Sequence, residues 1–204
     1  ERRLTYGEAA SQSARLARGM LASGISKGSR LGLLMPNSPD FVVAWLAAAR
    51  IGAIIIPINT FYKPRELAFV LHHADIQVLL TADKLLNNDY LERLETCIPQ
   101  LLEQPRSADS SKPLLLREFP FLRHIYVWGE AARHWSSSQQ QLLDAAELLD
   151  EEYLAAVEDC VCPADLLTIV YSSGSTADPK GAMHSQGSVI RHSYNLNHWR
   201  DIQT

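Results

Sequence analysis

Apolar and polar positions alternate, from the start of the chain to Ala82, in blocks that predict strands separated by helices. Short runs rich in β-branched residues or leucine predict buried strands. The longer segments between them place apolar residues at helical spacing. The predicted strands are 30–35, 53–58 and 76–82, and the predicted helices are 5–25, 37–52 and 64–74.

Two of these helices carry start signals. Thr5 is predicted to cap the first helix, with Glu8 as its capping-box partner three residues later. Ser38 is predicted to cap the second, where Pro39 occupies the first helical position and its missing N–H costs nothing. The second helix is nearly all apolar, so we expect it to be buried.

The order of these elements predicts the fold. Strands separated by helices of this length are joined most simply by right-handed crossovers into a parallel sheet. Continuous apolar strands are typical of a sheet covered on both faces. We therefore expect an α/β protein with a doubly wound, mostly parallel sheet and flanking helices, which binds its ligands beyond the carboxyl ends of the strands.

The pattern is less regular over residues 84–164. We interpret 85–102 as one helix, 103–113 as a surface loop and 124–128 as a short strand. Nine acidic residues and no Lys or Arg lie between His134 and Pro179. Because charge runs are usually solvated, we interpret 141–157 as a solvated acidic helix face rather than a metal site.

Composition and charge restrict the partners. A net charge of -4 and a pI near 6.0 give no general attraction to nucleic acid or to an anionic membrane surface, so we expect small-molecule partners. The apolar runs are shorter than the ~20 residues of a membrane span. Cys97, Cys160 and Cys162 are too few for a disulfide framework and lack zinc-like spacing, so we expect structural or surface thiols and a cytoplasmic location.

A loop of small residues follows the predicted strand 166–171. Its hydroxyl groups, Gly174 and a terminal Lys180 suit an anion, because backbone N–H groups can converge on it and lysine adds charge. A helix is expected from Gln186. The spacing of a Walker P-loop is not met, because Pro179, Lys180 and Gly181 stand where Gly-Lys-Ser/Thr is required. On composition alone, a flexible connection remains the alternative.

The segment "YSSGSTADPKG" resembles the phosphate-binding signature of the adenylate-forming superfamily, which includes acyl-CoA synthetases, luciferases and peptide-synthetase adenylation domains. Residues 4–81 and 166–194 are similar to the beginning of such enzymes. The resemblance implies that 1–204 is a partial N-terminal AMP-binding domain. Its expected parts are a first α/β layer (1–83), a variable region (84–164), and a strand, phosphate loop and helix (165–204), with the C-terminal domain absent.

The resemblance also implies the site. Five residues are expected to contact the ATP phosphates, with a lysine at the pyrophosphate end: Ser172, Ser173, Gly174, Ser175, Thr176 and Lys180. The expected cofactors are ATP, magnesium and coenzyme A, and the expected substrate is a fatty or related carboxylic acid. The adenine motif, magnesium-binding glutamate, hinge aspartate and catalytic lysine of the family are expected beyond Thr204. No catalytic or metal-binding residue is therefore expected in this chain, and the fragment is expected to be inactive alone.

Some residues depart from the family signature, and others have two possible roles. Ala177 replaces the second glycine, as in a subset of acyl-CoA synthetases, and Gln186 stands where many members have histidine. Neither Gln186 nor His184 is assigned a catalytic role, and a structural role is favoured for His184. Four helix residues are expected either to touch the acyl site or simply to pack: Tyr194, Asn195, His198 and Trp199. An amino-acid-activating adenylation domain, a non-catalytic nucleotide-binding module and a homodimer are the other possibilities.

Overall fold

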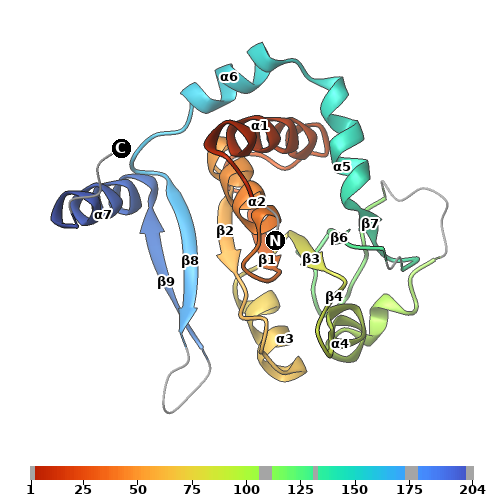
Figure 1. Cartoon of the computed structure of the whole chain (residues 1–204). Helices are drawn as coiled ribbons and strands as arrows, with labels where there is room; N and C mark the ends of the chain where they lie inside the picture. Colours follow the sequence, from red (N-terminus) through yellow and green to blue (C-terminus); the bar gives the residue numbers. More distant parts are fainter. Residues whose placement is uncertain (1–2, 106–111, 131–132, 173–178, 201–204) are drawn as a thin grey trace.

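The central feature of the computed structural model is a mostly parallel sheet with helices on both faces (Figure 1). The structure describes residues 3–105, 112–130, 133–172 and 179–200. Within these ranges the sheet has seven strands in the order β7-β6-β3-β1-β2-β8-β9. The strands are β1 Arg30–Leu34, β2 Ile54–Pro57, β3 Val78–Ala82, β6 His124–Trp128, β7 Ser137–Ser138, β8 Leu166–Ser172 and β9 Lys180–Ser185.

The sheet is doubly wound, as predicted. From β1 the chain moves one way across the sheet to β2, then back past β1 to β3. Right-handed connections in opposite directions put the two crossover helices on opposite faces. These helices are α2 Pro39–Arg50, which packs on α1 Tyr6–Ala22, and α3 Pro64–His73, which packs on α4 Tyr90–Cys97.

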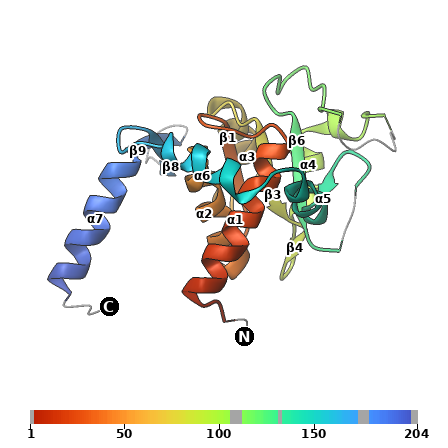
Figure 2. The ribbon, with the colours of Figure 1, turned by 90° about the horizontal axis from the view of Figure 1, so that it is seen from above.

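Three further helices follow the sixth strand. They are α5 Gln139–Ala145, α6 Glu151–Asp159 and α7 Gln186–Trp199. The first two pack on α1, whereas α7 follows β9 and, beyond its first turn, stands apart from α1 and α2 (Figure 2). None of the helices within the described ranges is both long and apolar enough to cross a membrane.

The predicted helix starts are confirmed. Glu8 N–H donates to Thr5 Oγ1 at 3.2 Å, and the Glu8 carboxylate accepts from the Thr5 N–H at 2.8 Å. Phe41 N–H donates to Ser38 Oγ at 3.2 Å, with proline first in the helix. The expectation that α2 is buried all round was wrong, because its other face leaves Val42 44% exposed.

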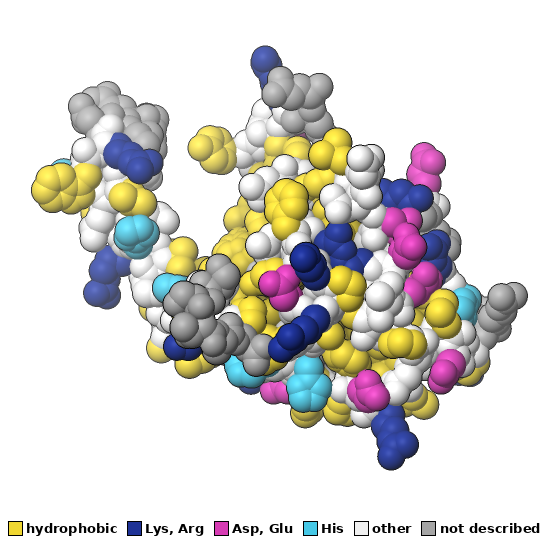
Figure 3. All heavy atoms as spheres, turned by 90° about the horizontal axis from the view of Figure 1, so that it is seen from below, with side chains coloured by type: hydrophobic (Ala, Val, Ile, Leu, Met, Phe, Trp, Pro, Cys, Tyr) yellow, Lys and Arg dark blue, Asp and Glu magenta, His cyan; other side chains and the backbone are white. Residues whose placement is uncertain are grey.

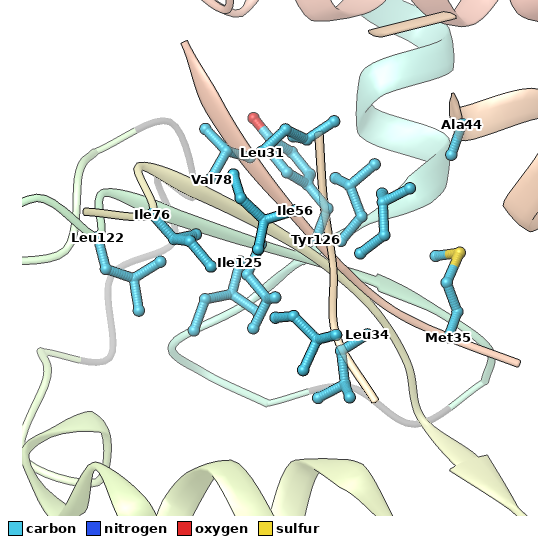
Figure 4. Packing of buried hydrophobic residues seen from close by; sticks show 14 of the residues in the cluster. Leu31, Leu34, Met35, Ala44, Ile56, Ile76, Val78, Leu122, Ile125 and Tyr126 are labelled. Carbon is cyan, nitrogen blue, oxygen red and sulfur yellow. The ribbon is translucent and has the colours of Figure 1, made fainter. Parts of the chain in front are cut away.

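The core lies where the central strands pack against these helices. Every residue of β3 is buried, and so is all of β1 after its first residue. Figure 4 shows Leu31, Ile56, Val78 and Ile125, which come from four different strands, packed together. Burial of each such side chain stabilises the fold by roughly 1.5–3 kcal/mol, as an upper bound.

The prediction of one helix over 85–102 was wrong. The segment forms a short ribbon, β4 Lys84–Leu85 and β5 Asn88–Asp89, then α4 and a 3₁₀ turn, Pro99–Leu101. Asp89 starts α4 by accepting the Glu92 N–H at 3.0 Å. The helix ends before Pro99, because proline lacks the N–H that an α-helix requires. The predicted loop 103–113 lies partly outside the described residues.

The acidic segment 141–157 is not one helix face. α5 ends at Ala145, a 3₁₀ turn covers Ala146–Leu148, and α6 begins after Asp150, which accepts the Tyr153 N–H at 2.7 Å. Part of the acidic charge is paired rather than simply solvated, since Glu147 forms an ion pair with Arg15 of α1 at 3.4 Å. The described residues contain no group of three or more His, Cys, Asp or Glu that could hold a metal.

Candidate functional site

The predicted phosphate loop lies at the tip of the β8–β9 hairpin. Ser172 is the last residue of β8 and Lys180 the first of β9, and the two are Cα partners across the antiparallel pair. Both side chains are exposed. The structure therefore brings together two of the six predicted residues, while Ser173, Gly174, Ser175 and Thr176 lie outside the described residues.

The expected passage from loop directly into helix was wrong. A six-residue strand, β9, separates the loop from α7, which begins at Gln186 as predicted. The sequence "KGAMHS" has no apolar alternation and contains a glycine, so its own pattern gives no strand signal. Pairing with β8 imposes the strand, and it places Lys180 on a strand opposite Ser172.

Two polar contacts join β8 to the rest of the molecule. Near its start, the buried Thr168 donates its hydroxyl to the Ile55 carbonyl of β2 at 2.7 Å. Near its end, the Tyr171 hydroxyl and His73 Nδ1 form a hydrogen bond of 2.7 Å, with the two rings edge to face at 5.8 Å. His73 is the last residue of α3, so this contact holds the tip of the hairpin against a crossover helix. Sequence reasoning missed it, because nothing in the pattern links residues 98 positions apart.

Gly181 is required by the packing of the hairpin. A Cβ atom at this position would lie 2.8 Å from Ile169 Cγ2 and 3.2 Å from Tyr171 Cζ. The 2.8 Å distance to Ile169 Cγ2 is shorter than almost any contact that a real Cβ atom makes. The glycine therefore allows the side chains of β8 to lie across β9, with the Tyr171 hydroxyl within reach of His73.

Hydrogen bonds of Ser185 and Gln186 fix the start of α7. Ser185 caps the helix by accepting the Ser188 N–H at 3.2 Å. The buried Gln186 side chain donates through Nε2 to the Ala49 carbonyl of α2 at 3.3 Å, and its backbone N–H donates to the Asp165 carbonyl at 2.8 Å. Gln186 thus has a structural role at the junction of α7 with α2.

The segment that leads into β8 is held by an ion pair. Lys27 Nζ lies 2.7 Å from Asp165 Oδ2, which also accepts the Cys162 N–H at 2.7 Å. The backbone hydrogen bond from Cys162 and the Lys27 ammonium lower the pKa of Asp165. Lys27 precedes β1, so the contact ties the entry of the hairpin to the centre of the sheet.

The α7 residues considered for the acyl site are exposed. Tyr194 is 73% exposed and Trp199 is 86% exposed. Figure 3 shows hydrophobic side chains on the surface of the part of the molecule that α7 forms. The alternative that these four residues simply pack in a core therefore finds no support within the described part of the chain. His184 is also exposed on β9, and no described contact supports the structural role expected for it.

The hairpin has the chemistry of an anion site. Ser172 offers a hydroxyl donor and Lys180 a positive charge, and no carboxylate in the described part of the chain pairs with that lysine. Hydroxyl and ammonium donors suit phosphate oxygens. A doubly wound sheet that ends in such a hairpin agrees with the expected AMP-binding domain. The chain belongs to the AMP-binding enzyme family, whose profile matches residues 1–203.

Individual relatives agree with this assignment. The chain is 30% identical over 191 residues to the acyl-CoA ligase SID4 of Ajellomyces capsulatus, and the match covers 94% of this chain and 30% of the relative. It is 29% identical over 197 residues to the peroxisomal long chain acyl-CoA synthetase 7 of Arabidopsis thaliana, covering 92% of this chain and 24% of the relative. The chain thus spans less than a third of the length of these curated relatives.

The fold agrees with solved structures. An anthranilate CoA ligase, AuaEII, solved with anthranoyl-AMP, superposes with a TM-score of 0.69 over 96% of this chain and 31% of its own, at 22% identity. At this identity the likeness supports the fold alone. The fold prediction, a mostly parallel sheet with flanking helices, is confirmed.

Proposed function

We propose that this chain is the N-terminal part of an AMP-forming acyl-CoA synthetase. The whole enzyme would join a carboxylic acid to AMP with release of pyrophosphate and then transfer the acyl group to coenzyme A. The observation that carries the proposal is the pairing of Ser172 with Lys180 at the tip of the hairpin, in a chain of the AMP-binding family. The relatives named as acyl-CoA ligases and synthetases support the choice of thiol acceptor.

In this proposal the hairpin holds the triphosphate of ATP. Ser172, Ser173, Gly174, Ser175 and Thr176 contact the phosphates, and Lys180 lies at the pyrophosphate end. A carboxylate has no good leaving group, so its oxygen attacks the α-phosphate to give a mixed anhydride, and negative charge builds on the departing pyrophosphate. Fixed hydroxyl, N–H and ammonium donors aimed at that charge lower the barrier and keep the reacting groups aligned.

The donor set of the hairpin fits phosphate rather than a metal ion. Serine and threonine hydroxyls and a lysine bind phosphate oxygens, whereas Mg²⁺ prefers carboxylates together with substrate phosphates. Neither Ser172 nor Lys180 supplies a carboxylate. In this proposal neither of these two residues is a magnesium ligand.

The substrate is proposed to be a fatty or related acid. The relatives do not agree on the acid, since one is named for long chains and the solved neighbour for anthranilate. Acceptance of one acid from a panel of aliphatic and aromatic acids, measured with the whole protein, would define the class. We also propose a cytoplasmic enzyme, because Cys160 and Cys162 are exposed thiols suited to a reducing compartment.

Replacing Lys180 or Thr176 in the whole protein tests the phosphate site. Lys180→Ala and Thr176→Ala should each weaken ATP use by roughly tenfold or more, as expected when one charge-assisted hydrogen bond is lost. Pyrophosphate release at increasing ATP measures this. Lys63→Ala, which removes an exposed lysine from another element, is the matched control and should leave ATP kinetics unchanged. Normal kinetics in both hairpin variants would place the phosphates elsewhere.

Supplying different acceptors separates the proposal from an amino-acid-activating domain. The proposed enzyme should release pyrophosphate with a carboxylic acid and form a thioester with free coenzyme A. Pyrophosphate release that depends on an amino acid, without a coenzyme A product, would favour the adenylation domain. Nucleotide binding with neither product would favour the non-catalytic module.

A further inference from the structure

A second candidate site lies at the opposite edge of the sheet. A cavity of about 390 Å³ opens beside β6 and β7, whereas β9 is at the other end of the strand order. Figures 1 and 2 show these two edges on opposite sides of the molecule. Its walls come from residues 112–115, the start of β6 and residues 134–137. The volume falls within the roughly 300–1,000 Å³ typical of small-molecule sites.

The inner walls of the cavity are apolar and held in place. Leu114, Ile125 and Trp135 line it, and each is at most 7% exposed. The Trp135 indole N–H donates to Glu95 Oε1 at 3.2 Å, which fixes the ring. The Leu114 N–H donates to the Arg123 carbonyl at 2.7 Å and so fastens the preceding loop to β6.

Gln104 and Leu115, which both line the cavity, are also joined to each other. The Gln104 side chain accepts the Leu115 N–H at 3.3 Å and donates to the Leu115 carbonyl at 3.4 Å. Because these contacts are made by the protein itself, the cavity is formed before any ligand binds. Such preorganisation reduces the entropy lost on binding.

The charged side chains of the cavity have one sign. Lys112, Arg123, His124 and His134 line it, and none of the described lining residues is Asp or Glu, in a chain whose net charge is -4. Within the described ranges no ion pair engages Lys112 or Arg123. Burial and the nearby Arg123 guanidinium lower the pKa of His124, the direction expected beside uncompensated positive charge.

Glu95, the acidic residue that contacts the lining residue Trp135, already has partners. Glu95 Oε1 accepts from Arg133 Nε at 2.8 Å as well as from the Trp135 indole. Its negative charge is therefore compensated by Arg133 and not by the cations that line the cavity. An apolar chamber with unpaired cations suits a ligand that carries one anionic group on an apolar body.

We propose that this cavity binds a small organic anion of the aryl or short-chain carboxylate class, at a site separate from the phosphate hairpin. The carboxylate pairs with Arg123 and Lys112, and the apolar body contacts Leu114, Ile125 and Trp135. The proposal rests on the cavity and its charges and stands independently of the function proposed for the hairpin.

Calorimetric titration of the whole protein with 2-naphthoate tests the proposal. Arg123→Gln and Lys112→Gln should each weaken binding by about tenfold, since each removes a charged hydrogen-bond donor. The neutral 2-naphthamide and inorganic phosphate should both bind far more weakly than 2-naphthoate, because each lacks one of the two features that the cavity recognises.

Two control variants locate the binding. Arg117→Gln removes a cation from the same loop outside the cavity and should leave 2-naphthoate binding unchanged. Lys180→Ala should also leave it unchanged, while still impairing ATP use if the hairpin is the phosphate site. Circular dichroism checks that each variant is folded. If Arg123→Gln does not fold, the binding measured for Lys112→Gln tests the proposal.

The proposal is overturned if 2-naphthoate binds equally well to both cavity variants, which is also the result expected if it binds only at the acid site of a synthetase. If 2-naphthamide bound as tightly as 2-naphthoate, the cations of the cavity would have no role in recognition. Phosphate binding as tight as that of 2-naphthoate would remove the role of the apolar walls.

Discussion

At the scale of single residues, Tyr171 and His73 connect the phosphate hairpin to the body of the protein. Tyr171 directly precedes Ser172, and its hydroxyl is bonded to the last residue of α3. Partial burial raises the pKa of Tyr171, so its hydroxyl keeps its proton at neutral pH. The pair is a positioning device, because neither side chain belongs to the predicted set of phosphate ligands.

Tyr171→Phe and His73→Phe test this role in the whole protein. A typical hydrogen bond contributes roughly 0.5–1.5 kcal/mol, so each variant should raise the KM for ATP by about threefold to tenfold. The kcat should change less, since the phosphate donors remain. The double variant should resemble the singles, because both remove one shared bond. Additive losses in the double variant would contradict this coupling.

The three cysteines differ in reactivity for a physical reason. Burial raises the pKa of the Cys97 thiol to about 12, whereas Cys160 and Cys162 are exposed. Only the thiolate is nucleophilic, so at pH 8 iodoacetamide should label Cys160 and Cys162 at least roughly tenfold faster than Cys97. Mass spectrometry of peptides measures this, with urea-unfolded protein as the control in which all three react. Equal rates in the folded protein would contradict the raised pKa of Cys97.

At the scale of elements, the sequence predicted what local signals specify. Capping residues specified the starts of α1 and α2, and β-branched runs specified the buried strands. The strand β9 and the ribbon β4–β5 were missed, because their short polar sequences become strands only through pairing with a neighbour. In the candidate site, the role of the hydroxyl groups and the lysine stays a prediction from the sequence, whereas the Tyr171–His73 contact could not be predicted because it depends on how α3 is placed.

The hairpin itself depends on a glycine. Gly181→Val should displace β9 from Tyr171 or Ile169, because its Cβ would overlap their side chains. We expect overpacking to destabilise the hairpin by roughly 1–3 kcal/mol and to weaken ATP use in the whole protein. Ala182→Val is the matched control, since this neighbouring residue is exposed and valine favours strands. ATP kinetics measured for both variants give the comparison, and normal kinetics in Gly181→Val would show that the close packing is not needed.

At the scale of the whole molecule, the described chain has a well-packed central core and a final helix with exposed apolar side chains. The central strands are buried on both faces, while α7 stands apart and exposes large aromatic side chains. Exposed apolar surface of this kind usually marks a contact with other protein. The chain spans less than a third of its curated relatives, and the described tip residues Ser172 and Lys180 offer a hydroxyl group and a positive charge.

We therefore predict that the 204 residues alone do not form an acyl-adenylate. Positioned phosphates do not suffice, because the acid must also be held in line with the α-phosphate, and misplacement by about 1 Å can slow such a reaction by roughly a hundredfold. Pyrophosphate release that depends on a carboxylic acid should be absent from the purified fragment and present in the whole protein. Circular dichroism would show whether the fragment is folded under the assay conditions. Acid-dependent pyrophosphate release from the folded fragment would mean that the catalytic groups lie within this chain.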